Sequence, residues 1–196
     1  MTEFEYAAVF YGIVVGLALQ NIFTSIHKLV EGGKRIHWHW MAPATALSAA
    51  ILTLGNFWFW WLGRGATGDL HPNIFLFLIR AVNLGLLFLA CAATLPDEVP
   101  ERGLDLRNYY FENRHRIWGF SAAFSFMNTC DWAVGIVSGA ITGPNLRMGL
   151  IFLAGNALAV IIDISLIFVR APWLHTIWIV SGIALLLLLY GPMPLR

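Results

Sequence analysis

The sequence predicts an all-α integral membrane protein with six transmembrane helices. Of its 196 residues, 59% are hydrophobic and 12% are charged, about half the charged share of a soluble domain. Apolar runs of about 20 residues, the length that a helix needs to cross the ~30 Å hydrocarbon layer, recur along the chain. One long polar segment, 97–116, separates them into two groups of three. Each run is expected to be helical because no water satisfies an exposed backbone in lipid.

The predicted spans are 6–30, 39–62, 74–96, 117–139, 147–169 and 173–192. They form a single transmembrane domain with a first three-helix half (1–96), a cytoplasmic linker (97–116) and a second three-helix half (117–196). No stretch outside the spans is long enough for a separate soluble domain. The acidic N-terminus and the long apolar run after it differ from a signal peptide, so the first helix is expected to be retained.

The linker is predicted to hold a short interfacial helix that begins near Leu106 and is capped by Asp105. Its apolar side chains would lie against the membrane: Leu106, Tyr109, Tyr110 and Ile117. Its arginines would contact lipid head groups or a partner protein: Arg107, Arg114 and Arg116.

Basic residues in the loops predict the orientation of the chain. One side carries most of them: Lys28, Lys34, Arg35, Arg102, Arg107, Arg114, Arg116 and Arg170. The other side carries Arg64, Arg147 and Arg196. The positive-inside rule then places both termini outside the cytoplasm.

Aromatic residues cluster at the predicted ends of the spans, as is typical of membrane interfaces. Phe57 to Trp61 would mark the outer end of the second span, where Trp58, Trp60 and Trp61 contact lipid or a partner protein. The inner interface would be marked by Trp38, Trp40, Tyr109, Tyr110, Trp118 and Trp173.

Glycines spaced four apart predict close helix packing in the first and fourth spans. Gly12 and Gly16, like Gly135 and Gly139, would lie near the outer face, where these two helices could approach each other or a second copy could dock. Three-helix halves of opposite polarity are also the topology of an inverted repeat. Simple packing and a repeat both remain open.

Polar residues in lipid are expected to face the interior of the bundle. The first span carries such a stripe at helical spacing, namely Gly12, Gly16, Gln20, Thr24, His27 and Glu31. Further stripes, which include Asn128 and Asn156, predict a polar centre between the first, third, fourth and fifth spans, with the aliphatic sixth span as an outer wall. Arg80 and Asp131 fall at similar depth and are predicted to form an ion pair.

Asp163 falls in the other leaflet, where no basic residue lies at its depth. A carboxylic acid in that setting can relay protons, or it can simply bond to Asn21 or Asn156. Both interpretations remain open. Replacement of Asp163 by asparagine would separate them, because only proton-coupled activity depends on titration.

Chemistry-bearing residues form no catalytic motif, and the protein is not expected to be an enzyme. Cys91 and Cys130 fall in opposite leaflets and are not expected to form a disulfide. The inner-side histidines are His27, His37, His39, His115 and His175. They are interpreted as interfacial; no metal or other cofactor is indicated, although contact with haem or a pigment stays open. A net charge of +1 argues against binding of nucleic acid.

Leu95-Pro96-Asp97-Glu98, then Asp105 to Tyr110 with Arg114 and Arg116, and the earlier Phe57 to Trp61 resemble a group of small uncharacterised bacterial polytopic membrane proteins. The likeness covers the chain through the fourth span. It implies a location in the bacterial inner (cytoplasmic) membrane and brings no activity, cofactor or catalytic residues.

Two functions are compatible with these features. The first is a non-catalytic accessory or scaffold subunit of a larger membrane complex, whose partners are lipid and other membrane subunits or further copies of the chain. The second is a small transporter or channel with a polar path between the first, third, fourth and fifth spans. The sequence indicates no substrate, no particular partner and no oligomeric state.

Overall fold

A computed structural model describes residues 3–63 and 74–190. Six helices make up most of this part of the chain: α1 (Glu3–Gly32), α2 (Met41–Gly63), α3 (Ile74–Thr94), α4 (Leu106–Val137), α5 (Pro144–Phe168) and α6 (Pro172–Tyr190). The short elements are η1 (Gly33–Arg35), β1 (Ile36–His37) and β2 (Leu104–Asp105). All six predicted runs are therefore helical.

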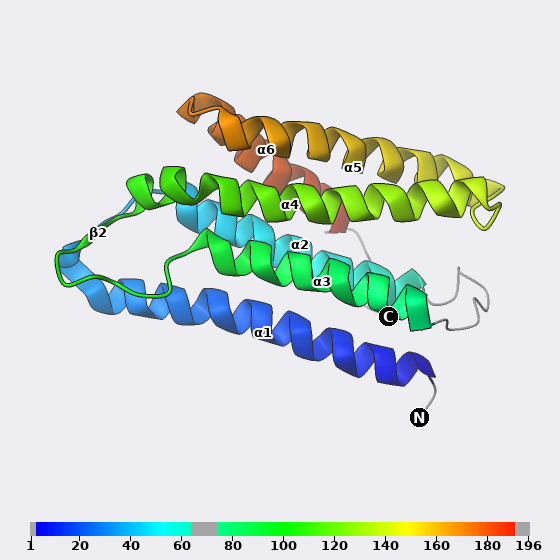
Figure 1. Cartoon of the computed structure of the whole chain (residues 1–196), viewed down its shortest axis with the longest axis horizontal. Helices are drawn as coiled ribbons and strands as arrows, with labels where there is room; N and C mark the ends of the chain where they lie inside the picture. The colour runs from blue at the N-terminus through cyan, green and yellow to red at the C-terminus, as the bar shows by residue number, and fades with distance from the viewer. Residues whose placement is uncertain (1–2, 64–73, 191–196) are drawn as a thin grey trace.

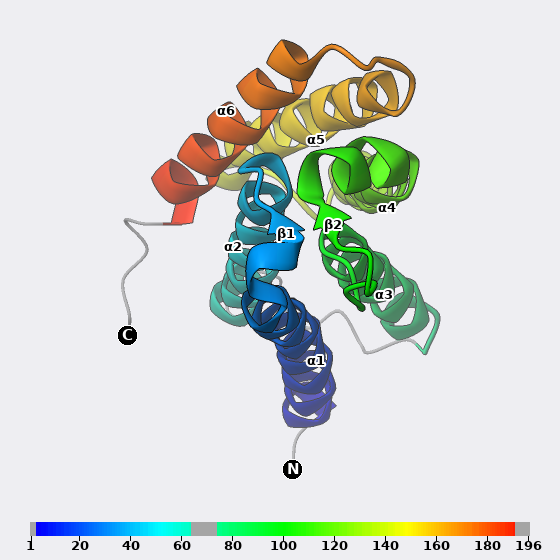
Figure 2. The same cartoon turned by 90° about the vertical axis from the view of Figure 1, so that its left-hand side faces the viewer.

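The six helices run side by side as a bundle (Figure 1). The end view in Figure 2 shows α2 near the centre, in contact with α1, α3, α4 and α6. α4 packs against α3 and α5. The first three helices all contact one another, whereas α6 packs mainly on α2 of the other half. The two halves are thus packed differently, and the structure gives no support to an inverted repeat.

Five of the described helices are long and apolar enough to cross a bilayer. The candidate spans are Ala8–Arg35, Met41–Phe59, Phe77–Thr94, Asn145–Phe168 and Pro172–Leu189. α4 is 32 residues long but is not among them, because polar residues occur along its whole length. The chain therefore has the architecture of a polytopic, membrane-embedded helical protein, and a sixth crossing by α4 stays a prediction.

The connection between the halves is shorter than predicted. β1 and β2 pair in parallel, with Ile36 opposite Leu104 and His37 opposite Asp105. The predicted cap is confirmed, since the Asp105 carboxylate accepts from the backbone N–H groups of Arg107 and Asn108. The prediction of a separate short helix in the linker is wrong, because α4 runs without a break from Leu106 to Val137.

One side of the first turns of α4 packs inside the protein, whereas Arg107, Asn108 and Glu112 are exposed. Leu106, Tyr110 and Ile117, predicted to lie against lipid, are buried. They join the largest apolar cluster of the bundle together with Leu29 of α1 and Met41 of α2. The strand pair explains the difference, because it draws the start of α4 against the chain between α1 and α2.

Gly103 lies close to Arg35 directly before the strand pair, and its replacement by alanine is expected to be costly. Its φ is +89°, and an added Cβ would lie 2.7 Å from the Arg35 carbonyl oxygen. We expect Gly103→Ala to lower the free energy of unfolding by about 2 kcal/mol or more, of which about 1–2 kcal/mol is the left-handed backbone alone. Gly33→Ala is the matched control, since Gly33 has a φ of +52° but open space around it. If both variants lose the same free energy of unfolding in detergent-solubilised protein, the clash with the Arg35 carbonyl oxygen is not a cause of the loss.

Candidate functional site

The clearest site is a group of buried and half-buried polar side chains between α4, α5 and α6, here called the inner polar cluster. Its members are Tyr110, Trp118 and Ser121 of α4, Asp163 of α5, and His175 and Trp178 of α6. Figure 2 shows these three helices on one side of the bundle. The cluster lies toward the end of the bundle that carries β1 and β2, the strand-bearing end.

Asp163 is 1% exposed and accepts a hydrogen bond at each carboxylate oxygen. The Ser121 hydroxyl donates to Oδ2 at 2.7 Å, and the Trp178 indole N–H donates to Oδ1 at 2.9 Å. The carboxylate therefore joins α5 to both neighbouring helices. Neither donor is the predicted Asn21 or Asn156, so that expectation is wrong.

His175 is fully buried, although the sequence placed it at the membrane interface. Its Nε2 lies 3.1 Å from the Val169 carbonyl oxygen and its Nδ1 lies 2.8 Å from the Tyr110 hydroxyl. A carbonyl only accepts, so Nε2 carries the proton and Nδ1 is the acceptor. The Tyr110 hydroxyl donates to Nδ1 and itself accepts from the Trp118 indole N–H at 3.1 Å. A directional chain of three hydrogen bonds results.

Aromatic rings enclose the His175 imidazole. Tyr110 and Phe111 meet it edge-on, with ring centroids 5.4 and 5.3 Å away, and Trp118 lies at 6.2 Å. Burial raises the pKa of the Tyr110 phenol well above its usual value, opposed by the hydrogen bond from Trp118. Tyr110 is therefore a neutral hydroxyl donor. The arrangement excludes water and fixes the ring positions.

Arg114 also serves the bundle more than the lipid surface. Its Nε donates to the Ile167 carbonyl at 3.0 Å and its Nη1 to the Phe111 carbonyl at 2.6 Å. Ile167 is in the last turn of α5, where a cation is favourable. Arg114 is thus half-buried and bonded within the bundle, whereas Arg107 and Arg116 are exposed. Contact of the three arginines with head groups or a partner stays a prediction.

Arg80 and Asp131 do not form the predicted ion pair. Among the described side chains the only salt-bridge contact joins His27 and Glu31, at 3.4 Å. Arg80 is half-buried, and both charges lie near the Tyr11 phenol of α1. Asp131 is exposed, as is the neighbouring Cys130.

The amides predicted to line a polar centre bond within their own helices. Asn128 donates to the Phe124 carbonyl and Asn156 to the Phe152 carbonyl, both four residues earlier. Asn21 is half-buried, whereas Gln20 is exposed. Among the described residues, Asn128 and Asn156 therefore make no hydrogen bond between helices, although Arg80 of α3 and Asp131 of α4 lie near Tyr11 of α1.

The polar stripe of α1 points away from the bundle, which reverses the prediction. Its members are all exposed: Gly12, Gly16, Gln20, Thr24, His27 and Glu31. The opposite side of the helix packs inward and carries Tyr11, Val15, Ala18, Ile22, Ser25 and Leu29. This set recurs at helical spacing and contacts α2 and α3. We call the exposed stripe the outward face of α1.

The two glycine pairs do not bring α1 and α4 together. Open space surrounds Gly12 and Gly16 on the outward face of α1. Gly135 lies against Ile141, which follows it in the turn to α5, and Gly139 is exposed with φ +75°. Figure 2 shows α3 between α1 and α4.

Other predicted contacts are partly described. Trp58 is half-buried, whereas the side chains of Trp60 and Trp61, and residues Arg64 and Arg196, lie outside the described residues. Cys91 is buried, Cys130 is exposed and both are free. Within the described part of the chain, no three His, Cys, Asp or Glu side chains are placed to hold a metal ion.

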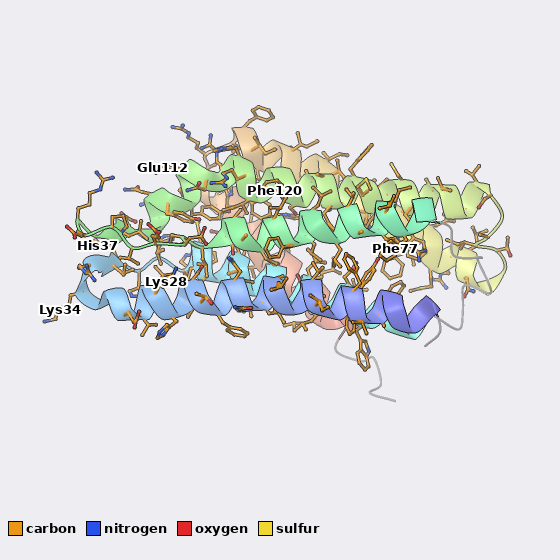
Figure 3. The ribbon with its side chains drawn as sticks, turned by 60° about the horizontal axis from the view of Figure 1, so that its bottom comes forward. Lys28, Lys34, His37, Phe77, Glu112 and Phe120 are labelled. Carbon is orange, nitrogen blue, oxygen red and sulfur yellow. The ribbon has the colours of Figure 1, made fainter. Side chains whose placement is uncertain are left out.

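The histidines of the strand-bearing end differ from one another. Figure 3 shows His37 with Lys28 and Lys34 at that end. His27, His37 and His115 are exposed, whereas His39 is half-buried. Lys28 donates to the Asp97 carbonyl at 2.7 Å and so links α1 to the connection between the halves.

The inner polar cluster was only partly visible in the sequence. The sequence predicts that Asp163 lies within a span, but it places Tyr110, Trp118 and His175 at the inner interface and gives no particular role to Ser121 or Trp178. One available signal was the spacing of His175 and Trp178, which places them on one side of an otherwise aliphatic helix. α6 is therefore not only an aliphatic outer helix, because it also contributes polar side chains to the cluster.

Fold and site together define a polytopic helical membrane protein with an internally bonded polar cluster and a polar helix face directed outward. Comparison with protein-family models, with curated proteins and with solved structures finds no match to this chain.

Proposed function

We propose that the protein is a non-catalytic accessory or scaffold subunit of a larger membrane protein complex, which it contacts through the outward face of α1. The observation that carries this proposal is the exposure of Gln20 near the middle of the candidate span Ala8–Arg35. Within the described residues, its amide forms no hydrogen bond. A helix of a partner subunit would supply one.

The residues beside Gln20 suit a helix–helix contact. Gly16 and Gly12 lie one and two turns away on the same face, with open space in which another backbone can approach closely. Thr24 adds a hydroxyl one turn further on. Polar side chains in a membrane normally face protein or a water-filled cavity, because hydrocarbon cannot satisfy them.

The proposed setting is the inner membrane of a bacterium, with both termini outside the cytoplasm. The basic residues of the strand-bearing end support this orientation, and the resemblance noted above supports the location. α4 would supply the sixth crossing, because it lies alongside the candidate spans (Figure 1).

The alternative is a small transporter or channel. It is favoured by one feature, the burial of Asp163 and His175, two titratable side chains, in a single cluster. Against it, the hydrogen-bonding atoms of both are occupied by neighbouring side chains and a carbonyl. Such bonds hold helices together without a conducting path.

Purification from native membranes in mild detergent tests the proposal. The wild-type protein is expected to elute in a complex larger than the monomer. Gly16→Leu should reduce the complexed fraction at least tenfold by placing a bulky side chain on the outward face. Gly155→Leu is the matched control, because Gly155 is also an exposed helical glycine with open space around it.

Equal thermal stability of the two isolated variants would show that any loss of complex is not a loss of fold. A lone wild-type monomer that dissipates an ion gradient in liposomes would overturn the proposal and favour the transporter. A complex that survives Gly16→Leu unchanged would remove the outward face from the contact.

A further inference from the structure

An apolar cleft of about 230 Å³ lies between α5 and α6. α5 lines it with Ile162 and Leu166, Val169 borders it directly after α5, and α6 lines it with Leu174, Ile177 and Trp178. Ser165 also borders it, but its hydroxyl donates to the Ile161 carbonyl of its own helix. The cleft therefore offers contact area without a free polar group.

Trp178 forms a fixed wall of this cleft. Its indole N–H is held by the Asp163 carboxylate at 2.9 Å, so its polar edge is satisfied inside the bundle and its ring is left for the cleft. The inner polar cluster thereby positions an apolar surface. Preorganised walls of this kind lower the cost of binding.

The surrounding medium restricts what can enter. Apart from Val169, the lining residues belong to the candidate spans Asn145–Phe168 and Pro172–Leu189, so the cleft would face hydrocarbon when these helices cross a bilayer. Its volume exceeds the ~150 Å³ of an apolar cavity that accommodates benzene. An acyl chain is the apolar group that a bilayer presents in quantity.

A positive charge stands at one end of the cleft. Arg170 directly follows the lining residue Val169 and is exposed. Within the described residues it takes part in no salt bridge, so its charge is not offset. A guanidinium matches a phosphate group with two parallel hydrogen bonds. Trp173, 62% exposed, lies in the same turn and suits the head-group layer.

We propose that the cleft between α5 and α6 binds one acyl chain of an anionic phospholipid, whose phosphate pairs with Arg170. The apolar walls select a chain, and the unpaired guanidinium selects a negative head group over one whose ammonium group offsets the phosphate. This site is independent of the outward face of α1. It needs no partner subunit.

Native mass spectrometry of the delipidated full-length protein tests the site with two probes, phosphatidylglycerol and phosphatidylcholine of equal chain length. We expect wild-type protein to bind the first at least tenfold more tightly. Arg170→Gln should abolish this preference and weaken phosphatidylcholine binding much less than phosphatidylglycerol binding. Arg147→Gln, an exposed arginine at the start of α5, is the matched control and should retain it.

A second pair of variants tests the cleft itself. Ile177→Trp fills it from a position that is 57% exposed and should weaken binding of both lipids at least tenfold. Ile161→Trp adds the same bulk at a 64% exposed position of α5 that does not line the cleft. The proposal is overturned if wild-type protein binds both lipids equally, if Arg170→Gln keeps the preference, or if both tryptophan variants bind alike.

Discussion

Asp163→Leu is expected to lower the free energy of unfolding by about 2 kcal/mol. The change leaves the Trp178 indole N–H and the Ser121 hydroxyl without their acceptor. A buried donor left unpaired costs about 1–3 kcal/mol. Two such donors would cost about 2–6 kcal/mol together. Because interhelical hydrogen bonds in membranes average only about 0.6 kcal/mol, we expect a loss at the lower end of this range. Denaturation by SDS in mixed micelles, followed by tryptophan fluorescence, measures the change.

Two further variants make this result specific. Asp163→Asn keeps one carbonyl acceptor and should lose under about 1 kcal/mol. Asn156→Leu, two turns earlier on the same side of α5, removes an amide that bonds only to its own helix and should change stability by under about 0.5 kcal/mol. An Asn156→Leu loss as large as that of Asp163→Leu would show that the carboxylate does not join the helices.

Tyr110→Phe is expected to lower stability by about 1–3 kcal/mol. The substitution leaves His175 Nδ1 without a donor and the Trp118 indole N–H without an acceptor, while the ring packing is kept. The same denaturation experiment measures the loss. In addition, the ¹⁵N chemical shift of His175 Nδ1 should move, because that nitrogen no longer accepts a hydrogen bond.

Tyr109→Phe is the natural comparison, because the neighbouring tyrosine makes a single 3.2 Å hydrogen bond to the Ala93 carbonyl. Its loss should be smaller, and the His175 shift should stay unchanged. If both variants behave alike, the hydrogen-bond chain through Tyr110 is not a distinct stabilising element.

The helices and one cap could be read from the sequence for simple physical reasons. Length and apolarity of the runs determine which segments are helical in lipid, and the Asp105 carboxylate has a local role at a helix start. Both properties depend on neighbours in the chain. The continuity of α4 could not be read, because the strand pair that buries Leu106 joins residues almost 70 positions apart.

The prediction of which side of α1 faces the bundle was wrong for a different reason. The rule that polar residues face the interior of their own bundle assumes that no other protein contacts the helix. α1 has a second stripe, through Val15, Ala18 and Ile22, that fits α2 and α3 better. Periodicity identifies both stripes and does not say which of them a neighbour covers.

The donors to Asp163 could not be predicted because Ser121 and Trp178 lie 42 and 15 residues from it in the chain, and the sequence does not show which neighbouring helix faces the carboxylate. The hydroxyl and the indole N–H each donate to one of its oxygens. The mainly aliphatic composition of α6 also concealed His175 and Trp178. Both cases show that a single polar residue on an apolar helix can carry a helix–helix contact.

Site-specific photo-crosslinking in native membranes tests the outward face of α1 most directly. A benzophenone amino acid at position 20 should form an adduct with a protein, in at least tenfold greater yield than the same group at Val180, which is exposed on α6. Lipid adducts alone at position 20, or equal protein yields at both positions, would contradict the assignment of this face to a partner subunit.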